Sequence, residues 1–214
     1  MLTVIFSTIL MIILHHSILN NYTQWFSRYI CGYIFSLVNS GLLSLLYLFT
    51  YLHTPIVLEQ SFSYWGKFLL GCHAGYYISD LWEVVLLGDK TYIFHHTFSI
   101  YFIILAYLQD FMGYFMIAMF AVEVSAFIVN LRYLHYKFCG PFENWVDRLL
   151  LGIYFITRIP YVGLALIYKY HHMQLPEIWI SYQIMMCEIV YIVMSTSWNV
   201  KYIQQHQTMS QSHS

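Results

Sequence analysis

The chain alternates between long apolar runs and short polar loops. Most of the apolar runs approach or exceed about 20 residues, the length that an α-helix needs to cross the hydrocarbon of a bilayer. The pattern therefore predicts an all-α integral membrane protein with about seven transmembrane helices. The expected helices are residues 2–19, 29–52, 68–88, 91–109, 112–131, 148–169 and 177–198.

The composition agrees with a chain that faces lipid. Hydrophobic residues make up 60% of the 214 positions and charged residues only 9%, whereas soluble domains carry about 25% charged residues. So few charges cannot cover a water-facing surface, and lipid must be the main solvent of the fold. The net charge of −1 provides no basic surface for nucleic acid, which we exclude as a partner. The four cysteines form no Cys-x-x-Cys pair, and no disulfide framework is expected.

The chain divides into three parts. Residues 1–28 form an N-terminal membrane segment with its loop, and residues 29–203 form the main transmembrane domain. Residues 204–214 form a polar tail that we expect to be disordered. The first apolar run lacks the basic start and the cleavage site of a signal peptide, so we interpret it as a retained span. It reaches spanning length only by including His15 and His16, which we interpret as interfacial histidines.

The lysine and arginine residues predict an orientation. With seven spans, one side of the membrane carries Lys67 and Lys169, and the opposite side carries six basic residues. Basic residues concentrate on the cytosolic side of membrane proteins. We therefore expect a lumenal or external N-terminus and a cytosolic C-terminus. The residues on the expected cytosolic side are Arg28, Lys90, Arg132, Lys137, Arg148 and Lys201.

Three ionisable residues are expected near the middle of the membrane. A charge in hydrocarbon is costly unless it is paired or hydrated, so such residues are candidates for a functional site. A helix rises about 1.5 Å per residue, and Asp80, Glu123 and Arg158 then lie roughly 13–15 Å from the cytosolic ends of their spans. We expect Arg158 to pair with these two carboxylates.

A second group of ionisable residues lies nearer the cytosol. Glu83, His95 and His96 flank Lys90 in sequence and lie roughly 8–10 Å deep on two adjacent helices. A carboxylate beside a histidine fixes the tautomer of the ring and raises its basicity. The strictly apolar part of this span, residues 97–108, is too short to cross a bilayer. The two histidines must therefore enter the membrane and face the bundle interior or a wet cavity.

Both groups also have a purely structural interpretation. Buried ion pairs and histidines can fix the register of membrane helices without any chemistry. We predict no metal site, because adjacent histidines on a helix point about 100° apart and no His-Glu-x-x-His motif is present. The chain also has no phosphate-binding glycine loop and no Gly-x-Ser-x-Gly nucleophile motif.

The ordered set of these residues resembles the TLC-domain family of membrane proteins, which includes ceramide synthases and translocating-chain-associating proteins. The resemblance covers about residues 30–200 and is closest to the TLC-domain-containing branch. It implies that six of the seven helices form a bundle around an internal cavity, in the endoplasmic reticulum membrane. The matching segments are Gly75-Tyr-Tyr-Ile-Ser-Asp80, His95-His96, Glu123-Val-Ser-Ala-Phe-Ile-Val-Asn130-Leu-Arg132-Tyr133 and Arg158.

The chain departs from the ceramide synthases at positions that their chemistry uses. Ceramide synthases carry a His-Asp-x-x-Asp cluster after the double histidine, and its positions here are Val122, Glu123 and Ala126. Only one carboxylate remains, and Ser99 takes the place of a family threonine. General acid–base catalysis needs a matched pair of groups, so the resemblance leaves acyl transfer open.

The resemblance implies three candidate functions. The first is a protein that binds or handles lipid or acyl chains and influences membrane lipid composition, with no resident cofactor. The second is an N-acyltransferase that uses acyl-CoA as co-substrate and a long-chain amine, and the third is a cargo receptor or translocation accessory protein. The candidate catalytic residues are His95, His96, Asp80 and Glu123, and the candidate lipid- or acyl-binding residues are Glu83, Ser99, Asn130 and Arg158.

Overall fold

The computed structural model describes five segments of the chain, residues 1–23, 26–53, 63–109, 112–140 and 142–158, together with six single positions between 186 and 196. Within these segments the chain is entirely α-helical. The helices are α1 (Leu2–Tyr22), α2 (Arg28–His53), α3 (Tyr64–Leu87), α4 (Lys90–Gln109), α5 (Met112–Cys139) and α6 (Asn144–Arg158).

The helices follow the expected spans, with extensions at polar ends. The prediction of an all-α membrane fold is confirmed in its coarse form, since α1, α2 and α4 contain stretches long and apolar enough to cross a membrane. These stretches are Leu2–Asn21, Ile30–Thr50 and Lys90–Leu108. Helix α3 carries His73, Asp80 and Glu83, which lower its hydropathy. The number of seven spans stays a prediction, because the expected seventh helix falls mostly outside the described residues.

A tight turn with glycine and aspartate joins α3 to α4. Gly88 ends α3 in the left-handed conformation at φ 73°, and its N–H donates to the carbonyls of Val84 and Val85. Asp89 then begins α4, because its carboxylate accepts hydrogen bonds from the backbone N–H groups of Thr91 and Tyr92. The turn places the end of α3 beside the start of α4, so that Asp80 of α3 can contact His96 of α4.

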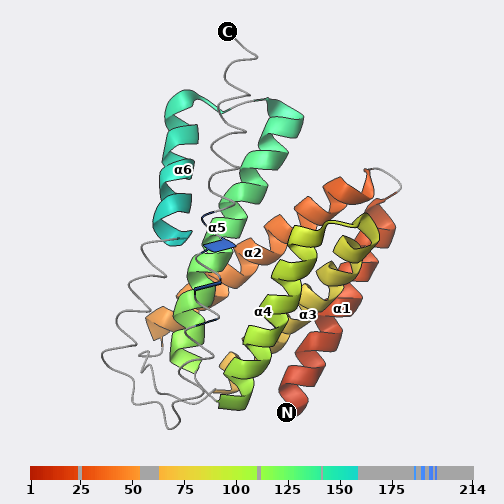
Figure 1. Cartoon of the computed structure of the whole chain (residues 1–214), viewed down its shortest axis with the longest axis vertical. Helices are drawn as coiled ribbons and strands as arrows, with labels where there is room; N and C mark the ends of the chain where they lie inside the picture. The colour runs from red at the N-terminus through yellow and green to blue at the C-terminus, as the bar shows by residue number, and fades with distance from the viewer. Residues whose placement is uncertain are drawn as a thin grey trace.

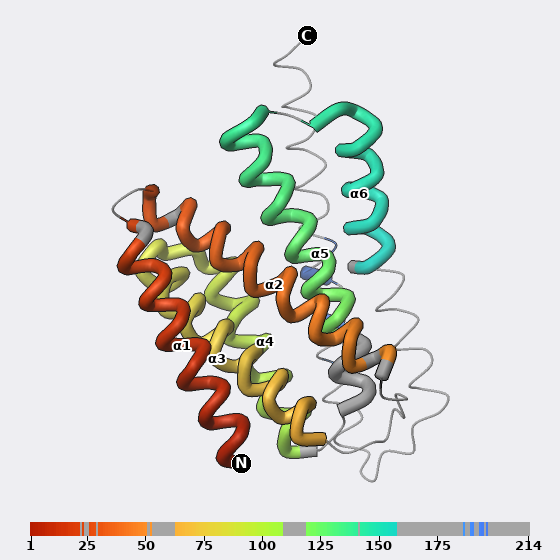
Figure 2. Tube along the Cα trace, turned by 180° about the vertical axis from the view of Figure 1, so that it is seen from behind, coloured from red at the N-terminus to blue at the C-terminus, as the bar shows by residue number. Residues whose placement is uncertain are grey.

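The helices form two groups, which Figures 1 and 2 show from opposite sides. In the first group, α3 packs against both α1 and α4. In the second, α5 packs against both α2 and α6. Helix α2 runs obliquely between the groups and also contacts α1 and α3. Interactions that join α2 or α5 to α3 therefore hold the two groups together.

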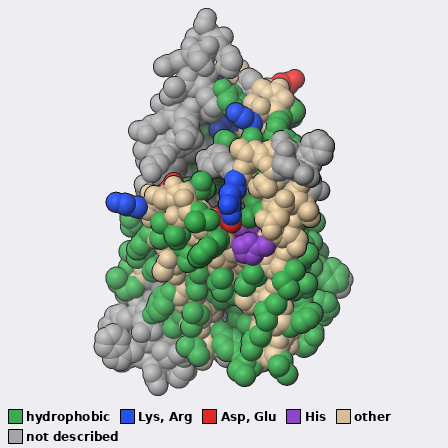
Figure 3. Space-filling model, turned by 90° about the vertical axis from the view of Figure 1, so that its right-hand side faces the viewer, with side chains coloured by type: hydrophobic (Ala, Val, Ile, Leu, Met, Phe, Trp, Pro, Cys, Tyr) green, Lys and Arg blue, Asp and Glu red, His purple; other side chains and the backbone are tan. Residues whose placement is uncertain are grey.

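Apolar side chains cover the outside of the molecule while polar side chains lie inside. Helix α1 exposes Ile5, Phe6 and Ile9 but buries Ser7 and His15 completely. Figure 3 shows a face covered mainly by hydrophobic side chains, with a small area of charged and histidine side chains near its middle. This distribution is what a lipid solvent requires, because the outer surface must be apolar and polar groups must be satisfied internally.

Helix α1 lies unusually close to α3 at two glycines four residues apart. A Cβ atom on Gly71 would come within 1.9 Å of Ser7 Oγ and 2.6 Å of the Val4 carbonyl oxygen. A Cβ atom on Gly75 would come within 2.5 Å of the Thr8 carbonyl oxygen. Thr8 also donates a hydrogen bond of 3.1 Å from its hydroxyl to the Gly71 carbonyl. Small residues at this spacing allow membrane helices to pack closely.

We predict that alanine has opposite effects at different helical glycines. At Gly32, where a Cβ atom would meet nothing within 4 Å, Gly32→Ala should stabilise the protein by about 0.5–1 kcal/mol, the ordinary helix preference for alanine. Gly71→Ala and Gly75→Ala should destabilise it, because α1 must move away from α3. Thermal unfolding of the purified variants measures whether each substitution raises or lowers the stability of the protein. Equal stabilisation at all three positions would contradict the close packing of α1 on α3.

Candidate functional site

One face of α3 carries the polar residues of the bundle interior. His73, Tyr76, Asp80 and Glu83 follow each other at intervals of three, four and three residues, which places them on the same side of a helix. We call these four residues the α3 polar face. Each of them contacts a polar side chain of another helix, and these contacts define the candidate site.

Asp80 pairs with His96 of α4. The Asp80 Oδ2 and His96 Nε2 atoms lie 2.5 Å apart, and the side chains are 17% and 4% exposed. The other ring nitrogen, Nδ1, lies 2.8 Å from the backbone carbonyl oxygen of Tyr92. A carbonyl oxygen only accepts hydrogen bonds, so Nδ1 carries a proton and donates it to Tyr92. Both nitrogens of His96 are therefore occupied in this conformation.

Glu83 pairs with Arg28 at the start of α2. The guanidinium group donates two hydrogen bonds, from Nε to Oε2 at 2.5 Å and from Nη2 to Oε1 at 2.9 Å. The side chain of Arg28 is 52% exposed and that of Glu83 is 7% exposed. The hydrogen bond to Glu83 raises the pKa of Arg28 above its ordinary value, so the guanidinium stays charged. This pair lies one helical turn from the Asp80–His96 pair along α3.

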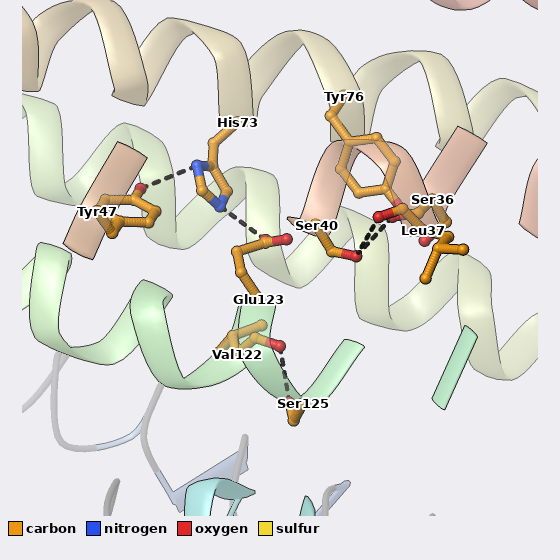
Figure 4. Close-up of polar contacts among 9 residues, drawn as sticks. All are labelled: Ser36, Leu37, Ser40, Tyr47, His73, Tyr76, Val122, Glu123 and Ser125. Carbon is orange, nitrogen blue, oxygen red and sulfur yellow. Dashed lines mark hydrogen bonds and ion pairs between the residues drawn. The ribbon is translucent and has the colours of Figure 1, made fainter. Parts of the chain in front are cut away.

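Glu123 of α5 pairs with His73, at the other end of the α3 polar face (Figure 4). His73 Nε2 lies 2.8 Å from Glu123 Oε1, and His73 Nδ1 lies 2.9 Å from the hydroxyl of Tyr47 on α2. All three side chains are at most 2% exposed. A single chain of hydrogen bonds therefore connects α2, α3 and α5 in the interior.

A second polar connection crosses the same three helices. Asn130 of α5 donates a hydrogen bond of 2.7 Å to the hydroxyl of Ser36 on α2. The Ser36 hydroxyl shares a hydrogen bond of 2.9 Å with the Tyr76 hydroxyl, as Figure 4 also shows. Asn130 was predicted as a lipid-binding residue, and these contacts place it among the side chains that join α2 and α5 to the α3 polar face.

The contacts between the described residues differ from the two groups of ionisable residues that the sequence predicted at different depths in the membrane. Glu83 pairs with Arg28 rather than with the histidines, and Glu123 pairs with His73, while Asp80 pairs with His96. That prediction used only the depth of each residue along its helix, and depth does not determine the direction of a side chain. The expected partner Arg158 ends α6, and its side chain lies outside the described residues.

The remaining candidates lie on α4 near this cluster. The ring of His95 is half-buried and contacts the rings of Tyr77 and His96 edge to face, at centroid distances of 5.9 and 5.1 Å. Ser99 is half-buried one turn later in the same helix. His95 and His96 therefore lie beside the α3 polar face, as the sequence predicted for an interior position.

The sequence did not lead us to predict His73 and Arg28 as partners of the buried carboxylates. His73 was not singled out, although its spacing of seven residues from Asp80 and ten from Glu83 places the three on one helix face. Arg28 was used only to mark the cytosolic end of a span. The available signal was the periodicity of polar residues within α3, which identifies a buried polar face before any partner is known.

A further ion pair joins α5 to α6. Arg132 donates hydrogen bonds to both carboxylate oxygens of Asp147, at 2.5 and 3.0 Å, and both side chains are largely buried.

Within the parts of the chain that the structure describes, no group of three histidine, cysteine or acidic residues could hold a metal ion.

The chain was also compared with known families and proteins. The TLC domain model matches residues 2–204, which is nearly the whole chain. The chain belongs to the TLC-domain family. The matched residues include α1. No curated protein and no solved structure matches this TLC-domain protein.

We predict that the two partners of the Arg28–Glu83 pair differ in their effect on stability. Glu83→Gln leaves the half-exposed Arg28 able to reach water, so it should cost less than about 1 kcal/mol. Arg28→Met leaves the buried Glu83 carboxylate without its guanidinium and should cost more, about 1–3 kcal/mol. Reversible unfolding in mixed micelles gives both values. A larger loss for Glu83→Gln than for Arg28→Met would contradict the described burial of this pair.

Proposed function

We propose that this TLC-domain protein binds a lipid or acyl chain inside its helix bundle and thereby influences membrane lipid composition. The observation that carries the proposal is the Asp80–His96 pair, in which His96 is buried and Asp80 is partly buried, and which lies next to the half-buried His95. A polar cluster within apolar walls suits a molecule with an apolar chain and a polar end. We propose the endoplasmic reticulum as its membrane, with the end that carries Arg28 and Lys90 toward the cytosol.

The hydrogen bonds that the ring nitrogens of His73 and His96 already make favour lipid binding over catalysis. A general base needs a ring nitrogen that can reach the substrate proton. In His96 one nitrogen faces Asp80 and the other donates to Tyr92, and in His73 both nitrogens have partners as well. Either ring would have to break an existing hydrogen bond before it could accept a proton.

The alternative function is an N-acyltransferase, which the Asp80–His96 pair also supports. A carboxylate that orients an imidazole is a common arrangement for a general base. His95 or His96 would accept the proton of an amine as its nitrogen attacks the thioester carbonyl of acyl-CoA. The new amide bond forms as the carbon–sulfur bond breaks, and coenzyme A leaves as a thiolate that takes up a proton.

The experiment that separates the two functions uses the purified protein with labelled acyl-CoA and a long-chain amine. Mass spectrometry measures both the lipids that co-purify and any amide product. We expect co-purifying lipid in the wild-type protein, less of it in His95→Ala and His96→Ala, and no product in any of them. The matched control is His135→Ala, because the described contacts of His135 are with residues just after α5. Its ring lies 2.9 Å from the Gly140 carbonyl oxygen and stacks on Phe142.

Two outcomes would contradict the binding function. Amide product that disappears in His95→Ala or His96→Ala, but not in His135→Ala, would establish the acyltransferase instead. A folded wild-type protein that carries no lipid and forms no product would exclude both functions.

A further inference from the structure

His15 is a buried histidine whose ring nitrogens lack partners among the described residues. Its side chain in α1 is 0% exposed, and neither Nδ1 nor Nε2 has a hydrogen-bond partner in the described structure. One ring face stacks on Phe35 of α2, with centroids 4.2 Å apart and an interplanar angle of 7°. The interfacial depth of His15 stays a prediction, but its side chain faces α2 rather than the surface of the bundle.

An unpaired imidazole in this position is unfavourable without a compensating contact. Even a neutral ring keeps one donor and one acceptor, and native proteins pair the great majority of such buried groups. Inside a membrane no bulk water can replace the missing partners. Phenylalanine would make the same stacking contact with Phe35 at no such cost, so packing alone does not explain a histidine here.

A series of ring contacts links His15 to the candidate site. The Phe35 ring, on which His15 stacks, lies 6.0 Å from the ring of Tyr76, and the Tyr76 ring lies 6.5 Å from that of His96, measured between centroids. Tyr76 belongs to the α3 polar face, and His96 is the partner of Asp80 on that face. His15 therefore adds α1 to a cluster that α2, α3 and α4 already form.

The charges of the cluster indicate which ligand would suit His15. Its two basic side chains in the described contacts already have acidic partners, Arg28 with Glu83 and His96 with Asp80. A phosphate group would have to break one of these pairs and would meet the carboxylates. A hydroxyl or amide group can both donate and accept, as a neutral imidazole does, and it adds no charge to the cluster.

We propose that His15 binds the uncharged polar head of a lipid, through a hydroxyl or an amide group, beside the Asp80–His96 pair. This inference rests on the proposed lipid-binding function and names the part of the lipid that the site recognises. The acyl chain of the same molecule would lie along the apolar side chains of the bundle. His15 is then a ligand-binding residue that α1 contributes, and the stack on Phe35 holds its ring in place.

Photoreactive lipids with one common acyl chain test the proposal on the full-length protein. The probes are a monoacylglycerol with free hydroxyls, an N-acylethanolamine with an amide, and a phosphatidic acid. His15→Phe keeps the stack on Phe35 and removes both nitrogens, whereas His15→Gln keeps a donor and an acceptor. The matched control is His16→Phe at the half-buried neighbouring position.

We expect one or both neutral probes to label the wild-type protein more strongly than the phosphatidic acid. His15→Phe should reduce this labelling about three- to tenfold, the effect of one neutral hydrogen bond. His15→Gln should retain more of it, and His16→Phe should label like the wild type. The melting temperature of His15→Phe without added lipid should be unchanged or higher, because two unpaired buried nitrogens are removed.

The failures of the two proposals are distinguishable. Unchanged labelling of His15→Phe, or preferred labelling by phosphatidic acid, would overturn the role of His15 and leave lipid binding intact. A lower melting temperature of His15→Phe would also overturn it, because the ring nitrogens would then have partners within the protein. A wild-type protein that none of the three probes labels would overturn lipid binding as well.

Discussion

The cost of a charge inside a membrane determines how these helices are arranged. Among the described residues, four carboxylates are buried or largely buried, Asp80, Glu83, Glu123 and Asp147, and each has a basic partner on a different helix. In hydrocarbon an unpaired carboxylate would be far more expensive than in water. Helix α3 contributes two of the carboxylates and one of the bases, so its neighbours must take positions that complete the pairs. For this reason, the helices that pair with α3 are arranged around its polar face.

The same constraint separates structural from functional histidines. His73 and His96 have hydrogen-bond partners on both nitrogens, and they satisfy the carboxylates beside them. His15 is equally buried but contributes no such contact among the described residues. Its position depends on Gly71 and Gly75, which let α1 approach α3 closely. The packing of α1 thus adds to the cluster the side chain that we propose to bind a lipid head group.

The sequence predicted the helices well and the polar partners poorly, for a physical reason. Apolar length decides where a helix exists, and α2 and α4 match the expected spans within a residue at each end. Helix α5 continues to Cys139, eight residues beyond its expected end at 131, and Arg132 in that extension pairs with Asp147. Depth along a helix predicts which residues enter the membrane. Partner choice depends on the direction of each side chain, so the pairing of Glu123 with His73 could not be predicted from depth alone.

A double-mutant cycle on His73 and Glu123 tests most directly whether paired charges hold the bundle together. His73→Phe and Glu123→Leu would be compared with the double variant by reversible unfolding in mixed micelles. Each single change should cost about 3–5 kcal/mol, because it leaves the other group buried without its partner. The double variant should lose less than the sum of the two, with a coupling energy of about 0.5–3 kcal/mol. Losses that simply add would show that the pair is not coupled and would contradict this account of the fold.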